Sequence, residues 1–364
     1  MEIELPGPED PKPPYGRTAH PYFLHDMIRS QPRAVAATVR EALRRARSIP
    51  APPVGRPLLF VGMGTSFHAA VASARGAEAA FGPGRPCRPV DAFELLLEPD
   101  RITGAGAAIV FSSSGETALT LRAQEALRAG GVPQTLITGT ARCRSAELAD
   151  HVVLTQHATE EAWVHTVSYT TAIAAALSLE RVWAGRPVDD LSSVEAAMGS
   201  VVDREGDWKR LAGELRDCPK FLCLGSGYAE ATAREAALKL REGAARFVAW
   251  SGVEEFLHGI LPSVGPGTAV LAVSTSSLEQ RRAETAVRAA ARAGARTAWF
   301  HRGRPGPVPE EFEVPAAPGP VTPIVDIVPF QLLTYWLAVG EGRNPDVMGY
   351  DDPRIFAARR TYGM

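Results

Sequence analysis

The chain has 364 residues, 45% hydrophobic and 22% charged, and its 39 basic and 41 acidic residues leave a formal net charge of −2 at pH 7. This composition is that of a globular protein large enough for two domains, and the balanced charge gives no electrostatic case for binding nucleic acid or an anionic membrane. The first 17 residues are acidic and proline-rich, without the apolar core of a signal peptide, and no apolar run reaches the ~18 residues of a membrane span. We therefore expect a cytoplasmic protein without membrane or nucleic-acid partners.

Four cysteines are spread along the chain, and none has the spacing of a metal-binding finger. They are Cys87, Cys143, Cys218 and Cys223. So few cysteines in so long a chain do not form a disulfide scaffold, which favours buried thiols in a reducing compartment.

In chain order, residues 1–50 are predicted to form an N-terminal arm and helix, with residues 1–18 extended. The segment IPAPPVGRP, residues 49–57, is a stiff connector because proline restricts the backbone. Two domains follow, predicted over 51–200 and 201–343, and residues 344–364 form a C-terminal tail.

The two domains repeat one plan. PLLFVGMG in the first and PKFLCLGSG in the second are apolar runs that end in glycines and precede an alanine-rich helical stretch, as in a strand–helix unit. Gly62 and Gly225 are 163 positions apart (225 − 62), and Phe111 and Val273 are 162 positions apart (273 − 111). Because these two pairs of corresponding residues are separated by the same distance in sequence to within one residue, we infer a duplicated α/β domain.

Each half supplies about five strands that alternate with helices, which predicts an α/β fold with a parallel sheet covered by helices on both faces. The predicted strands lie near 58–62, 88–92, 107–112, 134–138 and 151–155 in the first half, and near 220–224, 246–250, 268–274, 296–300 and 311–315 in the second. Predicted helices include 117–129 and 279–293, and a helix at 169–184 with a polar stretch at 185–206 joins the halves.

A cluster of hydroxyl side chains follows the third strand of the first half, where Ser112, Ser113, Ser114 and Thr117 surround Gly115. Backbone N–H groups at a helix N-terminus point outward unpaired, and the helix dipole favours an anion there. One such serine most often caps the helix. Four hydroxyls around a glycine favour an anion site over simple capping.

Ser66 follows the first strand of the same half. The carboxyl ends of parallel strands converge on one crevice, so Ser66 can donate to the same ligand. The second half has Ser274, Thr275 and Ser276 in a comparable position but no glycine, and we interpret it as a pseudo-site or a capped helix. The glycines around Met63 lack the third glycine and the acidic residue of a dinucleotide-binding fingerprint.

A second candidate cluster lies in the second half, where Glu235, Lys239 and Glu242 are spaced i, i+4 and i+7 and so share one helix face. Taken by itself, this spacing is more often that of a solvated salt-bridge face. His258, next to a glycine in a loop, is a candidate proton shuttle, although a lone histidine is more often a hydrogen-bonded structural residue.

These motifs together resemble the sugar isomerase (SIS) family, in particular its double-SIS members, which include the isomerase part of glucosamine-6-phosphate synthase and aminosugar-phosphate deaminase/isomerases. The matching stretches, in family order, are GMGTSFHAA (62–70), FSSSGETALTLRAQEALRAGG (111–131), ATEEAWVHTVSYTTA (158–172), LGSGYAEATAREAALKLREGA (224–244), EEFLHG (254–259), VPFQLLTYWLAVGEGRNPD (328–346) and DDPR (351–354).

The resemblance implies roles for ten residues. The phosphate would be bound by Ser66, Ser112, Ser113, Ser114 and Thr117, and the sugar pocket would be lined by Glu160, Thr166 and Lys239. Glu242 would move a proton between C1 and C2, and His258 would open the sugar ring from the partner subunit of a homodimer. The tail, residues 344–364, would close over the site, and no metal or organic cofactor is implied.

The chain also departs from the synthase. We expect no N-terminal glutaminase domain, and Ala358 stands where the synthase has an imine-forming lysine. The run around Thr166 is closer to the deaminase/isomerase branch. We therefore expect a hexose 6-phosphate isomerase or aminosugar-phosphate deaminase. A fructosamine 6-phosphate deglycase and a non-catalytic sugar-phosphate sensor are the alternatives.

Overall fold

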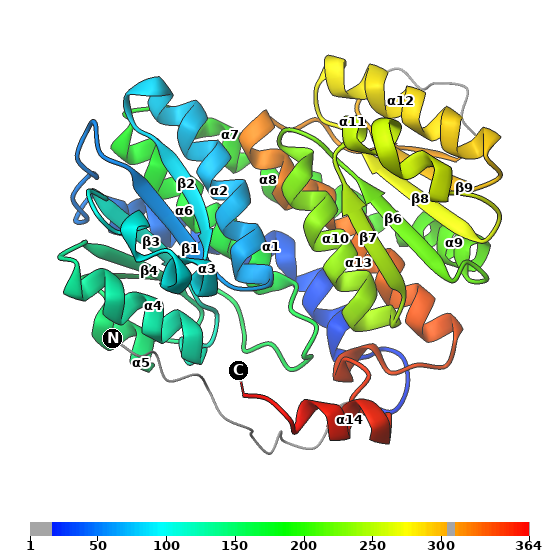
Figure 1. Ribbon diagram of the computed structural model, residues 1–364, viewed down its shortest axis with the longest axis horizontal. Coiled ribbons are helices and arrows are strands. Elements are labelled where there is room, and N and C mark those ends of the chain that lie inside the picture. The colour runs from blue at the N-terminus through cyan, green and yellow to red at the C-terminus, as the bar shows by residue number, and fades with distance from the viewer. Residues whose placement is uncertain (1–16, 304–309, 364) are drawn as a thin grey trace.

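Two parallel sheets of five strands, one in each half of the chain, form the framework of the protein (Figure 1). The computed structural model describes residues 17–303 and 310–363, so most of the predicted arm lies outside the described residues. The strands are β1 Leu58–Gly62, β2 Cys87–Asp91, β3 Ala107–Phe111, β4 Gln134–Thr138, β5 His151–Leu154, β6 Lys220–Leu224, β7 Phe247–Ser251, β8 Thr268–Val273, β9 Arg296–His301 and β10 Glu311–Glu313. The predicted α/β duplication is confirmed, and most strand boundaries agree within one residue.

The helices lie between the strands and at the chain ends. They are α1 Phe23–Ala46, α2 Thr65–Phe81, α3 Ala92–Leu97, α4 Ala118–Ala129, α5 Arg144–Leu148, α6 Val167–Trp183, α7 Asp189–Ser192, α8 Val194–Asp203, α9 Glu205–Leu215, α10 Ala229–Ala244, α11 Val253–Glu255, α12 Ser277–Arg292, α13 Thr322–Gly340 and α14 Pro353–Arg359. Single turns occur at Gly82–Gly84, Pro99–Arg101, Phe256–Ile260, Leu261–Ser263, Gly319–Val321 and Pro345–Val347.

Both sheets have the same strand order. It is β2-β1-β3-β4-β5 in the first half and, read from the opposite edge, β7-β6-β8-β9-β10 in the second. In each sheet the order reverses direction between the first and third strands of the half. Ligands of doubly wound sheets bind at the carboxyl ends of the strands beside such a reversal. The topology therefore predicts ligand sites at the ends of β1 and β3 and at the ends of β6 and β8.

Helices cover both faces of each sheet, which explains why strands such as β1, β4 and β8 are buried along their whole length. The largest core runs between the two halves and includes residues of α1, α2, α6, α10 and α13. Smaller cores lie on the outer faces, under α3 and α4 in the first half and under α12 in the second. The halves are therefore packed against each other through the helices that separate their sheets (Figure 1).

The stretch 185–206 is not the polar connector that we predicted, because most of it is helical. In α8, Val194, Met198, Val201 and Val202 are buried at helical spacing, and the helix packs against α1 and α13. The stripe is short and lies among polar residues, so the average polarity of the segment concealed it.

The expectation that no segment reaches membrane-spanning length also needs correction. The helical segment Gly319–Gly340, which contains α13, is long and apolar enough by length and composition, but 83% of its most apolar part is buried inside the protein. It is surrounded by α8, α9 and α10. Its uniform apolarity is that of a central core helix.

Candidate functional site

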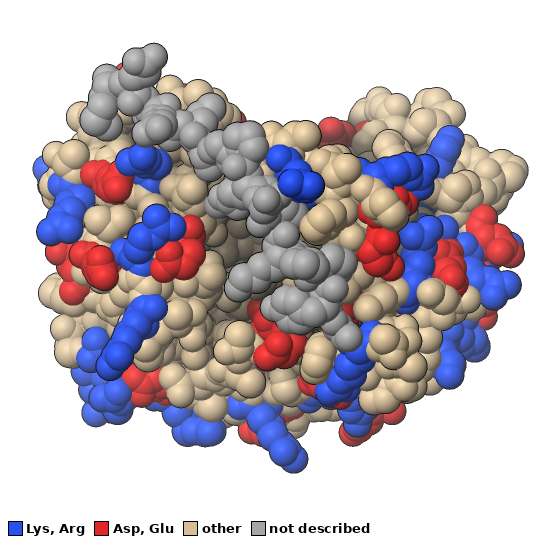
Figure 2. Space-filling model, turned by 90° about the horizontal axis from the view of Figure 1, so that it is seen from below, with Lys and Arg blue, Asp and Glu red and all other residues tan. Residues whose placement is uncertain are grey.

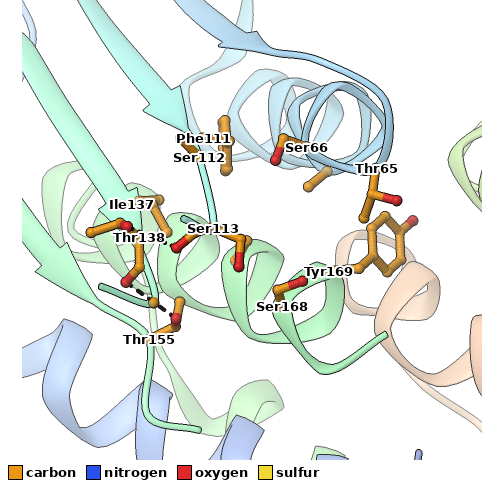
Figure 3. A pocket seen from close by; sticks show the side chains of 13 residues that line it. Thr65, Ser66, Phe111, Ser112, Ser113, Ile137, Thr138, Thr155, Ser168 and Tyr169 are labelled. Carbon is orange, nitrogen blue, oxygen red and sulfur yellow. Dashed lines mark hydrogen bonds between the residues drawn. The ribbon is translucent and has the colours of Figure 1, made fainter. Parts of the chain in front are cut away.

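A small pocket lies at the strand reversal of the first half, between the ends of β1 and β3. Hydroxyl side chains from three segments line it (Figure 3). Ser66 comes from the first turn of α2, Ser112 and Ser113 follow β3, and Ser168 comes from the first turn of α6. The hydroxyls of Ser66, Ser113 and Ser168 face one common space in Figure 3. Helices α2 and α6 thus begin at this pocket, and the N-terminus of α2 suits an anion.

Two of the hydroxyl groups near the pocket are not used for internal structure. The Ser112 residue is 4% exposed, and its Oγ has no hydrogen-bond partner within the described part of the chain. Thr117 stands at the N-cap position of α4 but makes no side-chain cap hydrogen bond, and it does not line the pocket. A buried hydroxyl without a protein partner is uncommon, and that of Ser112 is available to a ligand or to water. Helix capping therefore does not account for these residues.

Ser114 and Gly115 shape the loop instead of lining the pocket. The Oγ of Ser114 accepts a hydrogen bond from the backbone N–H of Glu116 at 3.2 Å. Gly115 has a φ of +71°, and a Cβ there would lie 2.2 Å from Sγ of Cys143. Another side chain at this position would strain the backbone and collide with Cys143. Gly115 is thus required for the fold of the loop.

The corresponding crevice of the second half is filled by the protein itself. The carboxylate of Glu279 accepts hydrogen bonds from the backbone N–H groups of Thr275 and Ser276 at 2.9 and 2.8 Å and from the Thr275 hydroxyl. The Ser276 hydroxyl completes a capping box with Glu279. A Cβ on Gly227 would collide with the same carboxylate. The pseudo-site interpretation agrees with this geometry, since a carboxylate already satisfies the N–H groups that an anion would need.

A buried charged cluster lies on α10, next to the first pocket. The Nζ of Lys239 lies 2.5 Å from Oε2 of Glu242 and 3.4 Å from Oε1 of Glu235. The side chains of Lys239 and Glu235 are fully buried, and that of Glu242 is 15% exposed. The three residues share one face, as the spacing predicted. The solvated-face alternative is wrong, because the face is turned toward α2 in the interior.

Thr65 and His68 of α2 complete the cluster from the other half of the chain. Lys239 donates a hydrogen bond to Oγ1 of Thr65 at 3.1 Å, and Thr65 donates to Oε1 of Glu235 at 3.1 Å. His68 Nδ1 lies 2.7 Å from Oε2 of Glu235. Thr65 also lines the hydroxyl-lined pocket, beside Ser66. This pocket and the charged cluster are therefore continuous.

The cluster perturbs the ionisation of its members. Burial raises the pKa of Glu242 above its ordinary value, and Glu235 adds to the rise, while Lys239 opposes it. Burial also works against the charge of Glu235, but Lys239 and His68 bring its net pKa below the ordinary range. A carboxyl with a raised pKa beside an ammonium is suited to taking up and returning a proton near neutral pH.

Glu160 and Thr166 lie at the start of α6. Glu160 Oε1 accepts hydrogen bonds from the backbone N–H groups of Thr166 and Val167 at 2.6 and 2.9 Å, and its Oε2 is 2.9 Å from Nδ1 of His165. Burial would raise the pKa of Glu160, but His165 and these hydrogen bonds lower it to about 2. The Thr166 hydroxyl is buried without a partner within the described residues. Glu160 thus has a structural task as the cap of α6.

Within a single chain, His258 does not contact the charged cluster on α10. Its side chain is 81% exposed and lies 3.7 Å from Glu254, one turn away. The predicted origin of His258 from a partner subunit stays a prediction.

The C-terminal segment packs beside the cluster. The backbone carbonyl of Asp346 accepts a hydrogen bond from Trp163 N–H at 2.8 Å, and the Tyr350 ring packs edge-on against Trp163 at 5.0 Å. The charge of Glu242 contributes to the raised pKa of Tyr350, after the larger effect of burial, which places this ring near the acid/base candidate. The tail therefore approaches the cluster, while its predicted closure over a ligand stays untested.

Sequence reasoning did not select four residues that the structure brings into the site: Thr65, His68, Ser168 and Glu235. Thr65 adjoins Ser66, and Glu235 had been noted on the face of Glu242, so local signals existed for both. The contact of His68 with Glu235 joins α2 to α10 across 167 positions, and no local pattern carries it. Among the described residues, no group of three or more histidine, cysteine, aspartate or glutamate side chains is arranged to hold a metal ion.

Comparison with known proteins agrees with this architecture. The profile of the SIS domain matches residues 214–340. Curated relatives include the glutamine–fructose-6-phosphate aminotransferases [isomerizing] of Thermococcus kodakarensis, 27% identical over 91% of this chain and 57% of that protein, and of Aeropyrum pernix, 30% identical over 91% of this chain and 56% of that protein. The chain thus spans about half the length of the curated relatives it matches.

Solved structures share the fold at low identity. The C-terminal domain of glucosamine-fructose-6-phosphate aminotransferase from Francisella tularensis superimposes with a TM-score of 0.80 at 21% identity, covering 91% of this chain and 99% of that one. Glucosamine-6-phosphate deaminase from Thermotoga maritima gives 0.74 at 20% identity, covering 90% and 98%. Tagatose-6-phosphate ketose/aldose isomerase from Escherichia coli gives 0.74 at 19% identity, covering 93% and 97%. Residues 214–340 thus match the SIS domain, and the two sheets have the fold of these solved structures.

Proposed function

We propose that this protein binds a hexose 6-phosphate, in particular an aminosugar phosphate, and transfers a proton between C1 and C2 of the open-chain sugar. Isomerisation alone, or isomerisation followed by release of ammonia, would be the net reaction. The observation that carries the proposal is the continuity of the hydroxyl-lined pocket with the Lys239–Glu242 pair through Thr65.

The pocket supplies the binding part of the proposal. Ser66, Ser112 and Ser113 offer hydroxyl donors, and the N-terminus of α2 offers backbone dipoles, to a phosphate dianion. A phosphate held at one end orients the sugar, so that binding energy far from the reacting carbons is used for positioning.

Glu242 supplies the acid/base part. As a carboxylate it takes the proton from C2 of an open-chain aldose, leaving an enediolate or, from an aminosugar, the corresponding enaminolate. When this proton is returned to C1 and the proton on O2 or on the 2-amino group passes to O1, the product is the ketose or the 2-imine. Water then converts the 2-imine to ketose and ammonia. Lys239, 2.5 Å from Glu242, provides a fixed positive charge beside the developing negative charge.

His258 and a second subunit complete the proposal. The His258 side chain is exposed on its own chain, where it is accessible to a second copy of the protein. In a homodimer with shared sites, its imidazole would move the proton between the ring oxygen and the anomeric hydroxyl during ring opening.

The test is a substrate panel. Purified protein is incubated with glucosamine 6-phosphate, galactosamine 6-phosphate or fructose 6-phosphate in D₂O, and ammonia, ketose and aldose formation are assayed together with deuterium incorporation at C1 and C2. We expect turnover of at least one substrate with deuterium at C1 or C2. Binding without turnover would support a sensor instead. No binding of any hexose phosphate in the Ser66–Ser113 pocket would refute the proposal.

A further inference from the structure

His68 is a titratable side chain in the site for which the proposed reaction gives no task. It lies on α2 in the first half of the chain, and its Nδ1 is 2.7 Å from Oε2 of Glu235 on α10 in the second half. The His68 side chain is 15% exposed, whereas that of Glu235 is fully buried. A polar contact of this kind can serve only to hold α2 against α10. The charged groups around the His68–Glu235 contact show whether it also affects Glu242.

The buried cluster has two carboxylates and one ammonium. Lys239 Nζ is nearer to Glu242, at 2.5 Å, than to Glu235, at 3.4 Å. Glu235 nevertheless stays ionised in a dry environment, which requires other donors. Thr65 supplies one donor to Oε1 and His68 supplies the other to Oε2. Both oxygens of Glu235 therefore accept hydrogen bonds from side chains of α2. The ammonium of Lys239 can then stay close to Glu242.

The other ionisable groups around Glu242 are also known. His165, from the segment before α6, and Tyr350, from the C-terminal segment, interact electrostatically with Glu242. Glu160 interacts with Lys239. Lys239 supplies the larger charge compensation of Glu235. Among the described residues, His68 supplies the hydrogen bond to its Oε2.

We propose that His68 is a positioning residue for Glu242, acting through Glu235: its hydrogen bond to Glu235 leaves the Lys239 ammonium to Glu242. This inference rests on the proposed function in so far as Glu242 is the acid/base group. The imidazole itself does not touch the reacting carbons. Its effect is on where the shared ammonium lies, and therefore on the proton affinity of Glu242.

The experiment compares His68→Leu with His68→Asn. Leucine removes the donor, whereas asparagine keeps an N–H that can reach Glu235. In the leucine variant Lys239 moves toward Glu235, and the protonated form of Glu242 is favoured. We expect the acidic limb of the pH profile of kcat/KM to move up by about one unit, so that kcat/KM at a pH on that limb falls about tenfold. His68→Asn should keep the limb within a few tenths of a unit of the wild-type value.

A second readout does not depend on turnover. The titration of Glu242 is followed by infrared spectroscopy of ¹³C-glutamate-labelled protein, as the difference between each protein and its Glu242→Gln counterpart. The titration should move upward in His68→Leu and not in His68→Asn. In a Glu235→Gln background, where no charge needs compensation, His68→Leu should leave the titration in place. If His68→Leu does not fold, His68→Ala removes the same donor.

The outcomes separate the two proposals. The positioning role is overturned if the titration of Glu242 does not shift in His68→Leu or His68→Ala. It is also overturned if His68→Asn shifts this titration as much as His68→Leu does. A pH-independent loss of activity also overturns it, because a purely structural latch would act in that way. If wild-type protein turns over no sugar phosphate, the proposed function fails, while the infrared titration still decides the role of His68.

Discussion

The Nζ of Lys239 lies 2.5 Å from Oε2 of Glu242, and neither side chain is on the open surface, since Lys239 is fully buried and Glu242 is 15% exposed. A glutamate in this position has a defined neighbour, limited water and a pKa raised mainly by burial. The Lys239–Glu242 pair thus differs from an isolated surface salt bridge. Such a surface pair typically contributes only ~0–1 kcal/mol to the free energy of unfolding. This pair is therefore the first target for substitution.

Glu242→Gln should abolish the proposed proton transfer, because the amide cannot accept a proton from carbon. We expect kcat to fall about 10²–10⁴-fold with little change in phosphate binding, as is usual for loss of a general base. Steady-state assays and binding calorimetry with the best substrate of the panel measure the two effects. The matched control is Glu214→Gln, a surface glutamate paired with Arg210, which should retain full activity. Undiminished turnover in Glu242→Gln would remove Glu242 from the mechanism.

Ser113→Asp should prevent binding of the phosphate. The new carboxylate would lie in the pocket where the dianion is expected, and two like charges within ~4 Å repel strongly in a partly buried site. Isothermal titration calorimetry with a hexose 6-phosphate should show a loss of at least 100-fold in affinity, roughly 3 kcal/mol. Ser200→Asp, at an exposed serine of α8, is the control and should bind normally. Equal affinities for both variants would place the phosphate elsewhere.

Glu160 should contribute to stability in a pH-dependent way. Its pKa is about 2 in the folded protein against an ordinary value of 4.5, so the unfolded chain takes up the proton first as the pH falls. The contribution is present above pH 4.5 and is lost between about pH 4.5 and 2. We expect Glu160→Gln to lower the free energy of unfolding by about 2–3 kcal/mol at pH 7.

Urea denaturation of wild type and Glu160→Gln at pH 7, 4 and 3 measures this difference. The gap should narrow steadily toward low pH, because the wild-type carboxylate loses its charge there. A gap that is constant from pH 7 to 3 would show that the charge of Glu160 is not what stabilises α6.

Glu180 is a buried acid that should destabilise the fold. The residue is 1% exposed, neither carboxylate oxygen has a hydrogen-bond partner within the described part of the chain, and burial raises its pKa well above the ordinary value. Because the folded state holds the proton more tightly than the unfolded state, the destabilisation is present above pH 4.5 and fades below it. Glu180→Met, of similar size, should raise the free energy of unfolding by about 1–3 kcal/mol at pH 7.

Thermal or urea unfolding at pH 7 and 4 tests the effect of Glu180. Glu180→Gln is the control, since it removes the charge but keeps an unpaired polar group, and its gain should be smaller. Lower stability of Glu180→Met than of wild type at pH 7 would mean that the carboxylate has a role in the fold.

A shared active site predicts complementation between two inactive variants. Glu242→Gln and His258→Asn proteins, unfolded together and refolded as a mixture, should regain about a quarter of wild-type activity, because half of random dimers are mixed and each has one intact site. Either variant refolded alone should stay inactive. If the mixture is as inactive as its components, His258 does not act across a subunit boundary.

Much of the fold was determined by local sequence. Short apolar runs between glycines and alanine-rich helical stretches predicted the strands, and β1, β4 and β6 were found with the predicted boundaries. A strand buried on both faces is mostly apolar, and such an apolar run is visible in sequence, as in β1. Helix α8 was missed because its stripe of four buried residues is short.

Local sequence patterns were enough to predict the duplicated α/β plan, the hydroxyl loop after β3 and the shared face of Glu235, Lys239 and Glu242, because these depend on residues that are near neighbours in the chain. The folded structure was needed to show that this face is buried, that Thr65 joins it to the pocket and that His68 contacts Glu235. It also decided that the second crevice is filled by Glu279. These facts depend on how α2 packs against α10 and on side-chain burial, and packing between elements far apart in the chain leaves no periodic mark in the sequence.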